Sequence, residues 1–218
     1  MKTIMHVILW GSLALHVVCF ITQILTNYAR RSVKGLSRIM VLANFAAYLL
    51  AVLYAFLLRQ PTAFKVMFIA GVLVSATLIG QCILYDKKKK RRQRLEWRMF
   101  LICLTVSVTA VWGHWEPLFV GNIAGWATTL LWFGFQIPQL WYFHTHHTVK
   151  GFNPLGTILL LAGSIGEIFA SLVLGLPPQT LWNGVRGMVF SILFLYEFAQ
   201  YDRSWGALVD KLLHEGHR

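Results

Sequence analysis

Long apolar stretches alternate with short polar connectors along the chain. Runs of about 20 apolar residues are long enough to cross the hydrocarbon core of a bilayer. The pattern predicts an all-α integral membrane protein with seven transmembrane helices, at 4–27, 38–58, 63–85, 97–113, 118–143, 155–174 and 180–201. The first stretch continues to about Leu25, which is too long for a cleaved signal peptide.

Basic residues are distributed unevenly among the connectors. If the seven helices alternate in direction, 16 Lys and Arg residues fall on one side and three (Lys2, Arg59 and Lys65) on the other. Because short cytoplasmic loops are enriched in Lys and Arg, the first side is expected to be cytoplasmic. The N-terminus is then outside and the C-terminus inside, as an odd number of spans requires.

Composition agrees with a membrane protein. Of the 218 residues, 57% are hydrophobic and 13% are charged, and the net charge is +12. The basic residues serve membrane topology in the connectors, so the lipid bilayer rather than nucleic acid is the expected partner. The three cysteines lie inside apolar runs and show no spacing typical of a disulfide framework.

The chain repeats itself at an offset of 116 residues. Trp10 matches Trp126, Gln23 matches Gln139, and identities continue as far as Tyr85-Asp86 with Tyr201-Asp202. We expect a first three-helix repeat at 1–87, a basic loop with a linker helix at 88–116, a second repeat at 117–203, and an amphipathic cytoplasmic tail at 204–218. A single linker helix makes the two repeats parallel, with a substrate site expected between them.

The most specific motif occurs once in each repeat. Ile137-Pro138-Gln139 is followed by a short basic turn and by Thr148-Val149-Lys150-Gly151-Phe152-Asn153, and the first copy reads Ile21-Thr22-Gln23 and then Ser32-Val33-Lys34-Gly35-Leu36-Ser37. This double pattern resembles the PQ-loop family. Relatives include SWEET sugar transporters, lysosomal exporters of cystine and cationic amino acids, and the KDEL receptor. The resemblance implies the same arrangement of three, one and three helices.

The motif suggests a hinge, or gate, formed by Pro138, Gln139, Gln23 and Thr22. Pro138 has no N–H to donate to the Gly134 carbonyl, which weakens the helix locally. Either a moving hinge or a static kink follows from this. Thr22 stands where the family usually has proline, so we expect the second repeat to move more than the first. The two glutamines contact solute or form interhelical hydrogen bonds.

Ionisable residues inside the membrane are costly and suggest function. Glu167 and Arg186 fall at similar depths of the sixth and seventh predicted helices, so we expect them to pair, either as a structural ion pair or as a site for a zwitterion. Glu167, Glu197 and His16 are candidates for proton coupling. A structural role is the alternative for each of them.

Further polar residues are candidates for lining the cavity: Asn44, Tyr48, Ser75, Asn122, Asn183 and Ser191. His144-Thr145-His146-His147 lacks a neighbouring carboxylate or cysteine, so no metal site is expected there. The sequence contains no nucleophile elbow, HExxH motif or phosphate-binding loop, so we expect neither an enzyme nor a cofactor.

These residues favour a transporter that works by alternating access on a small polar solute. An amino acid or similar zwitterion is the preferred substrate, with possible coupling to protons, and a sugar is the alternative. A sorting receptor similar to the KDEL receptor, or a scaffold without transport, is the alternative of another class. The absence of Asn-x-Ser/Thr sites fits a bacterial inner membrane, with an organelle membrane as the alternative.

Overall fold

A computed structural model describes residues 2–34, 36–85, 89–149 and 152–201. Within them the structure consists of helices joined by short turns. The helices are α1 (Lys2–Arg30), α2 (Arg38–Leu57), α3 (Thr62–Leu84), α4 (Lys89–Trp115), α5 (Pro117–Gly134), α6 (Ile137–His146), α7 (Pro154–Leu174) and α8 (Pro178–Tyr201). The predicted amphipathic tail at 204–218 lies outside the described residues.

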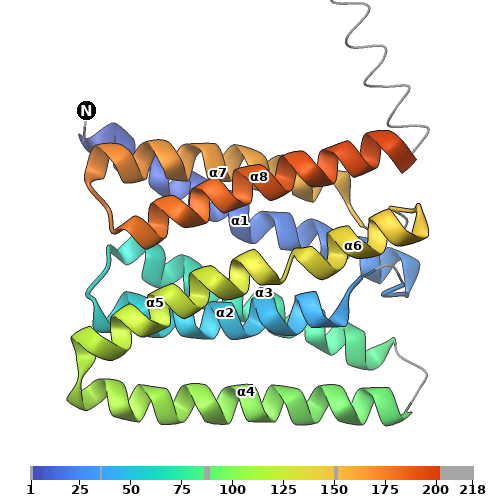
Figure 1. The fold of residues 1–218 in the computed structure, drawn as a ribbon, viewed down its shortest axis with the longest axis horizontal. Helices are drawn as coiled ribbons and strands as arrows, with labels where there is room; N and C mark the ends of the chain where they lie inside the picture. Colours follow the sequence, from blue (N-terminus) through green and yellow to red (C-terminus); the bar gives the residue numbers. More distant parts are fainter. Residues whose placement is uncertain (1, 35, 86–88, 150–151, 202–218) are drawn as a thin grey trace, which may run out of the picture.

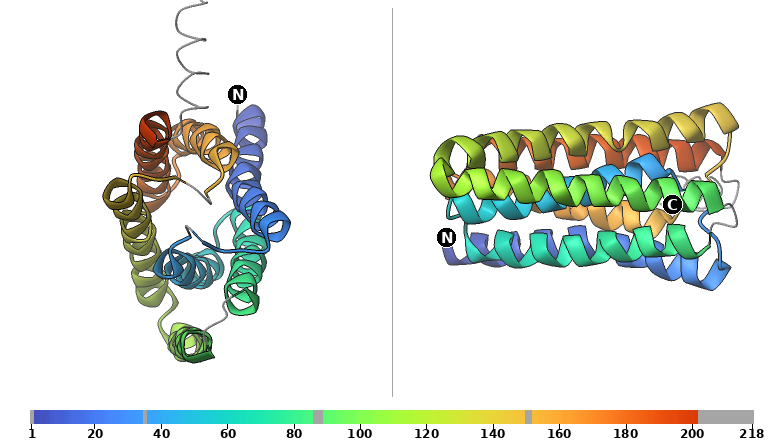
Figure 2. Two further views of the ribbon diagram at one scale, coloured as in Figure 1. Left: turned by 90° about the vertical axis from the view of Figure 1, so that its right-hand side faces the viewer. Right: turned by 90° about the horizontal axis from the view of Figure 1, so that it is seen from below.

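The helices run nearly parallel or antiparallel along one long axis (Figure 1). Seen along that axis, the helices form a ring made of α1, α2, α3, α7, α8 and the consecutive pair α5 and α6, and α4 lies outside this ring (Figure 2). Within each repeat the third helix packs on the second, α3 on α2 and α8 on α7. Between repeats, α1 packs on α7 and α2 packs on α5, so the two repeats contact each other twice in equivalent ways.

The C-terminal ends of α1, α3, α6 and α8 lie together at one end of the bundle (Figure 1). We call it the basic end, because Arg30 at the end of α1, Arg31 in the following turn and Arg38 at the start of α2 lie there. Two equivalent caps start the helices that leave this end. The side chain of Ser37 accepts from the Met40 amide at the start of α2, and that of Asn153 accepts from the Leu155 amide at the start of α7. Such caps satisfy amides that have no partner within the helix.

Within the described residues, six helical segments are long and apolar enough to cross a membrane, with α5 and α6 counted as one. The seventh predicted span, α8, is not among these six, although its 24 residues extend over roughly 36 Å. Large apolar side chains cover the outside of the bundle, among them Leu73, Val108, Leu130 and Leu172. A contiguous apolar surface of this extent is suited to lipid, and the protein is an integral, multi-pass membrane protein.

Two predicted helices differ from the observed ones. The fourth is not a short helix over 97–113 but has 27 residues, because its basic first turns extend it away from the apolar part. The fifth, expected as one helix over 118–143, is divided at Phe135 and Gln136 into α5 and α6. The division lies just before Pro138, as expected from its missing N–H. In contrast, α1 is continuous through the equivalent Thr22, whose hydroxyl donates to the Cys19 carbonyl at 2.7 Å.

Candidate functional site

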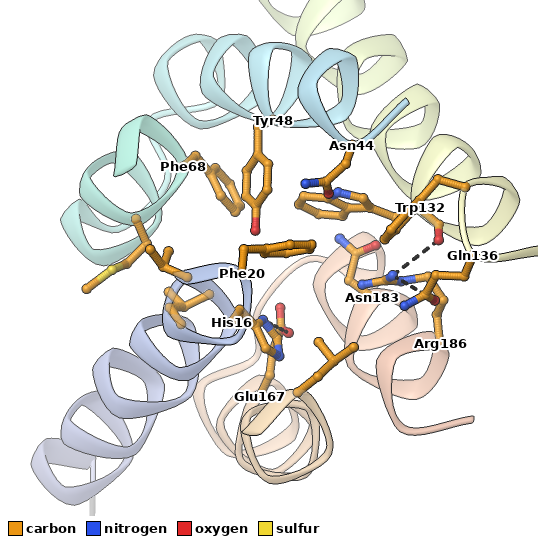
Figure 3. Close-up of a pocket in the computed structure, with 15 residues that line it drawn as sticks. His16, Phe20, Asn44, Tyr48, Phe68, Trp132, Gln136, Glu167, Asn183 and Arg186 are labelled. Carbon is orange, nitrogen blue, oxygen red and sulfur yellow. Dashed lines mark hydrogen bonds and ion pairs between the residues drawn. The ribbon is translucent and has the colours of Figure 1, made fainter. Parts of the chain in front are cut away.

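A central cavity lies between the two repeats, near the middle of the helices (Figure 3). Polar and aromatic side chains from α1, α2, α3, α5, α7 and α8 meet there, and Gln136 joins them from the division between α5 and α6. The labelled lining residues are His16, Phe20, Asn44, Tyr48, Phe68, Trp132, Gln136, Glu167, Asn183 and Arg186. The cavity leaves about 30 Å³ for the centres of water molecules, which is room for about two waters. A larger solute requires the repeats to separate.

One wall of the cavity holds a chain of three polar groups between α1 and α7. Nδ1 of His16 lies 3.5 Å from a carboxylate oxygen of Glu167. Nε2 of the same ring lies 3.3 Å from the hydroxyl of Ser164. Gly163 permits this close approach, because a Cβ there would lie 2.7 Å from the imidazole ring. The imidazole therefore lies between a buried carboxylate and a buried hydroxyl.

Arg186 lies on α8, the helix that packs next to α7, and forms no ion pair with a carboxylate among the described residues. Its Nη1 donates to the Trp132 carbonyl at 3.1 Å and to the Gln136 side-chain oxygen at 3.2 Å. The guanidinium also lies over the rings of Trp132 and Phe135, 5.4 and 5.8 Å from their centroids. Trp132 is in the last turn of α5, where carbonyls lack intrahelical partners and the helix dipole favours a cation. These contacts explain how the arginine is buried without an ion pair.

The expected pairing of Glu167 with Arg186 is therefore wrong. Both side chains are buried at the same cavity, but Glu167 pairs with His16 and Arg186 binds the end of α5. Sequence depth placed the two charges correctly along the axis but gave no information on which neighbouring helix each side chain faces. The two opposite charges are thus on separate walls, where each can meet a different group of a solute.

Other predicted residues divide into those that line the cavity and those that do not. Asn44 and Tyr48 line it, and Asn183 also does, with its Oδ1 lacking a hydrogen-bond partner in the described part of the chain. Ser75 and Ser191 are buried outside the lining, with Ser75 accepting a hydrogen bond from Asn44 at 3.0 Å.

Two predicted site residues lie away from the central cavity. Asn122 is exposed on α5, and its amide donates to the Leu118 carbonyl one turn earlier, so its assignment to the cavity is wrong. Helical periodicity places it on the outer face of α5, because the buried Val120, Gly121 and Ala124 define the inner face. Glu197 is buried near the basic end, 3.7 Å from Nδ1 of His144.

The repeat reveals how the cavity is built from equivalent positions. Tyr48 packs against Gly71, and the equivalent Ser164 packs against the equivalent Gly187, so a Cβ at either glycine would overlap its partner. Trp132 is the equivalent of His16. Glu167 and Arg186, however, correspond to Ala51 and Ala70 in the first repeat. The second repeat therefore contributes both of these charged residues through substitutions of small residues.

A second cavity lies between the central cavity and the basic end. It is lined by Cys19, Gln23, Phe152, Asn153 and Phe194 together with residues shared with the central cavity. The shared residues are Phe20, Phe135, Gln136 and Leu160. These four side chains form the partition between the two cavities, and two of them belong to the division between α5 and α6.

The two motif glutamines make reciprocal contacts between the repeats. Oε1 of Gln139 accepts from the backbone amide of Ser37 at 2.8 Å. Oε1 of Gln23 accepts from the backbone amide of Asn153, the equivalent of Ser37, at 3.2 Å. Each glutamine thus binds the capping residue of the other repeat, and the two bonds join the repeats at the basic end. Their expected interhelical hydrogen bonding is present, and Gln23 also lines the second cavity.

Sequence reasoning missed the aromatic and amide groups around the helix division, namely Phe20, Trp132, Phe135 and Gln136. For Phe135 and Gln136 the signal was present, because the three residues before a helix-interior proline lie at the weakened turn. Among the described residues the structure contains no cluster of three or more side chains suited to a metal ion.

A comparison with curated proteins finds no match. The fold is similar to that of a eukaryotic SWEET transporter, with a TM-score of 0.69 and 11% sequence identity, over 91% of this chain and 98% of that one. The sequence model named PQ loop repeat matches residues 4–64 and 120–180, more than half of the chain and one segment in each repeat. The chain therefore belongs to the PQ-loop repeat family.

Proposed function

We propose that this protein transports a small zwitterion, most simply an amino acid, across a membrane by alternating access. The observation that carries the proposal is the central cavity, where Glu167 with His16, and Arg186 on the neighbouring helix α8, face the same space without pairing with each other. The family assignment and the SWEET-like fold support transport as the activity. A solute between two parallel repeats is alternately exposed when the repeats rock against each other.

The proposed topology has seven spans, with α8 as the seventh. Arg186 and Glu197 lower its hydropathy, but both side chains are buried against other helices, where intramembrane charges are tolerated. The basic end is cytoplasmic by the distribution of Lys and Arg. We place the protein in a bacterial inner membrane and its N-terminus outside.

The charges around the cavity match the two ends of a zwitterion. The guanidinium of Arg186 is suited to a carboxylate, since it presents several donors in one plane. Glu167 is suited to an ammonium group, and the unpartnered Oδ1 of Asn183 is a second acceptor. This arrangement assigns the two charges to substrate rather than to each other.

The part of the cavity wall that holds Glu167 and His16 also provides a basis for proton coupling. When Glu167 binds an ammonium group, His16 loses its carboxylate partner, so substrate and proton compete for the same carboxylate. Glu197 and His144 provide a second pair near the basic end, where a proton can leave toward the cytoplasm. Transport driven by a pH gradient is the expected consequence.

A sugar is the second candidate substrate. Trp132, Asn44 and Asn183 line the cavity and supply an aromatic face and amide groups, and the similar solved structure is a SWEET transporter. A receptor similar to the KDEL receptor is less well supported. Arg186 is the one Lys or Arg among the described lining residues, whereas binding of a peptide terminus in that way would need several.

Thermal stabilisation of the purified protein distinguishes these candidates. A ligand that binds only the folded state raises the melting temperature. We expect stabilisation by one class of amino acids, and its loss in Glu167→Gln but not in Glu96→Gln, a matched change on the exposed surface of α4. Stabilisation by sugars alone would overturn the zwitterion assignment, and no stabilisation by any solute would favour the scaffold.

Uptake into proteoliposomes tests the transport itself. With the stabilising solute outside, an imposed pH gradient should accelerate uptake by the unmodified protein. In Glu167→Gln we expect this acceleration to vanish, whereas Glu96→Gln should behave as the unmodified protein does. Glu197→Gln tests whether the second pair shares the proton pathway, and full acceleration in that variant would restrict the pathway to His16 and Glu167.

A further inference from the structure

The contacts of Arg186 connect the cavity to the division between α5 and α6. One face of the guanidinium borders the central cavity, and Nη1 donates to the Trp132 carbonyl and to the Gln136 side chain. Trp132 lies in the last turn of α5, and Gln136 lies within the division itself. A single side chain therefore binds both edges of the division while facing the space where a solute would sit.

The division also determines how the two cavities communicate. Phe135 and Gln136 belong to the partition between the central cavity and the cavity toward the basic end. Any change in the backbone at these two residues moves the partition. The Pro138 ring removes the hydrogen bond that would otherwise keep this turn helical, so side-chain contacts have to hold its geometry.

We propose that Arg186 restrains the division between α5 and α6, and that a carboxylate in the central cavity releases this restraint. The inference rests on the proposed function for the identity of the carboxylate. The present acceptors of Arg186 are a neutral amide and the C-terminal end of α5, which carries roughly half an elementary charge. A substrate carboxylate carries a full charge and accepts two hydrogen bonds from a guanidinium, so it competes successfully for Arg186.

The competition gives the substrate a physical means of opening the path toward the basic end. Once the guanidinium turns to a carboxylate, the Trp132 carbonyl and the Gln136 side chain lose their shared donor. Nε of Arg186, which is buried and has no hydrogen-bond partner within the described ranges, is a further donor for the carboxylate once the guanidinium has turned toward it. Arg186 is in this view a positioning residue for the hinge as well as a substrate contact. The first repeat has Ala70 at the equivalent position and no such connection.

Hydrogen exchange of the backbone tests the restraint without any substrate. The measured segment is 133–140 around the division, and the matched control is the equivalent segment 17–24 in α1. In Arg186→Gln we expect exchange at 133–140 to become about tenfold faster, as for the loss of a hydrogen bond to a charged group. Exchange at 17–24 should not change. Gln136→Leu keeps the arginine and removes one acceptor, and should accelerate 133–140 less.

Acetate and acetamide test the release. The two molecules have the same shape, and only acetate has the charge that competes for Arg186. In the unmodified protein, acetate should accelerate exchange at 133–140, acetamide should not, and the acetate effect should be absent in Arg186→Gln.

Two results would overturn the inference. Unchanged exchange at 133–140 in both Arg186→Gln and Gln136→Leu would show that Arg186 does not restrain the division. Equal effects of acetate and acetamide would show that a carboxylate does not release it. If Arg186→Gln fails to fold, Gln136→Leu decides the first point and the acetate comparison decides the second. The proposed function fails separately, because thermal stabilisation by solutes does not depend on exchange at the division.

Discussion

The two repeats share one architecture but stabilise their basic ends by different chemistry. In the first repeat, Gln23 donates to Asn27, Asn27 donates to Gln81, and Gln81 donates to the Ile24 carbonyl, at 2.8 to 3.0 Å. These amides connect a continuous α1 to α3. In the second repeat, Phe143 stands in place of Asn27 and the motif helix is divided. The same fold therefore contains one half fixed by directional bonds and another held by aromatic packing.

Aromatic residues fill the second repeat where the first has smaller side chains. Phe143, Phe152, Phe194 and Phe198 contact one another with ring centroids 5.4 to 6.3 Å apart. Their equivalents are Asn27, Leu36, Leu78 and Cys82. Packed rings tolerate sliding and rotation better than a chain of hydrogen bonds, which loses its bonds when the donors shift. The difference supports the prediction that the second repeat moves more than the first.

Removing the centre of the aromatic cluster should have the largest effect on stability. Phe143 is fully buried among the other three rings. Phe143→Ala leaves a cavity, and we expect a loss of about 4 kcal/mol in the free energy of unfolding. Chemical denaturation in detergent measures it, with Trp141→Ala, a change of an exposed ring on the same helix, as the control. Equal effects of the two variants would contradict a central role of the cluster.

Restoring the missing helical bond should slow transport. In Pro138→Ala the new amide can donate to the Gly134 carbonyl, and α5 and α6 should join as α1 does. Since an interior proline costs a helix about 3 kcal/mol, we expect the rate of solute exchange to fall by about 100-fold. Thr22→Ala removes only a side-chain bond in the continuous helix and should change the rate little. An undiminished rate of solute exchange in Pro138→Ala would show that the division is a static kink.

The sequence predicted those features that depend on periodicity along the chain, and not those that depend on how neighbouring helices face each other. The 116-residue offset and the apolar runs predicted the repeats and most helices, because these depend on periodicity along the chain. The partner of Glu167 was not predictable, since it depends on rotation of α1 and α7 about their axes. The prediction that Asn122 lines the cavity was wrong for the same reason. The division at Phe135 followed from Pro138, but the binding of Arg186 to it required neighbouring helices to be placed in space.

The amide chain of the first repeat should be sensitive to loss of its middle member. Asn27 is buried and joins Gln23 to Gln81. Asn27→Leu leaves both glutamines short of a partner, and we expect a loss of about 2 kcal/mol in the free energy of unfolding. Removing the second partner as well, in Asn27→Leu with Gln81→Leu, should cost less than the sum of the single changes. Additive losses would show that the bonds are energetically independent.

The smallest expected effect concerns the contact that the two repeats share. Gln23→Met and Gln139→Met each remove one reciprocal bond to the opposite capping residue, worth about 1 kcal/mol. Cys19 lines the cavity behind this contact, so its reaction with a maleimide reports opening of the basic end. With Cys82 and Cys103 replaced by alanine, both variants should react about fivefold faster. A larger increase in Gln139→Met would show that the second repeat controls opening, whereas equal increases would mean that the two bonds close the basic end together.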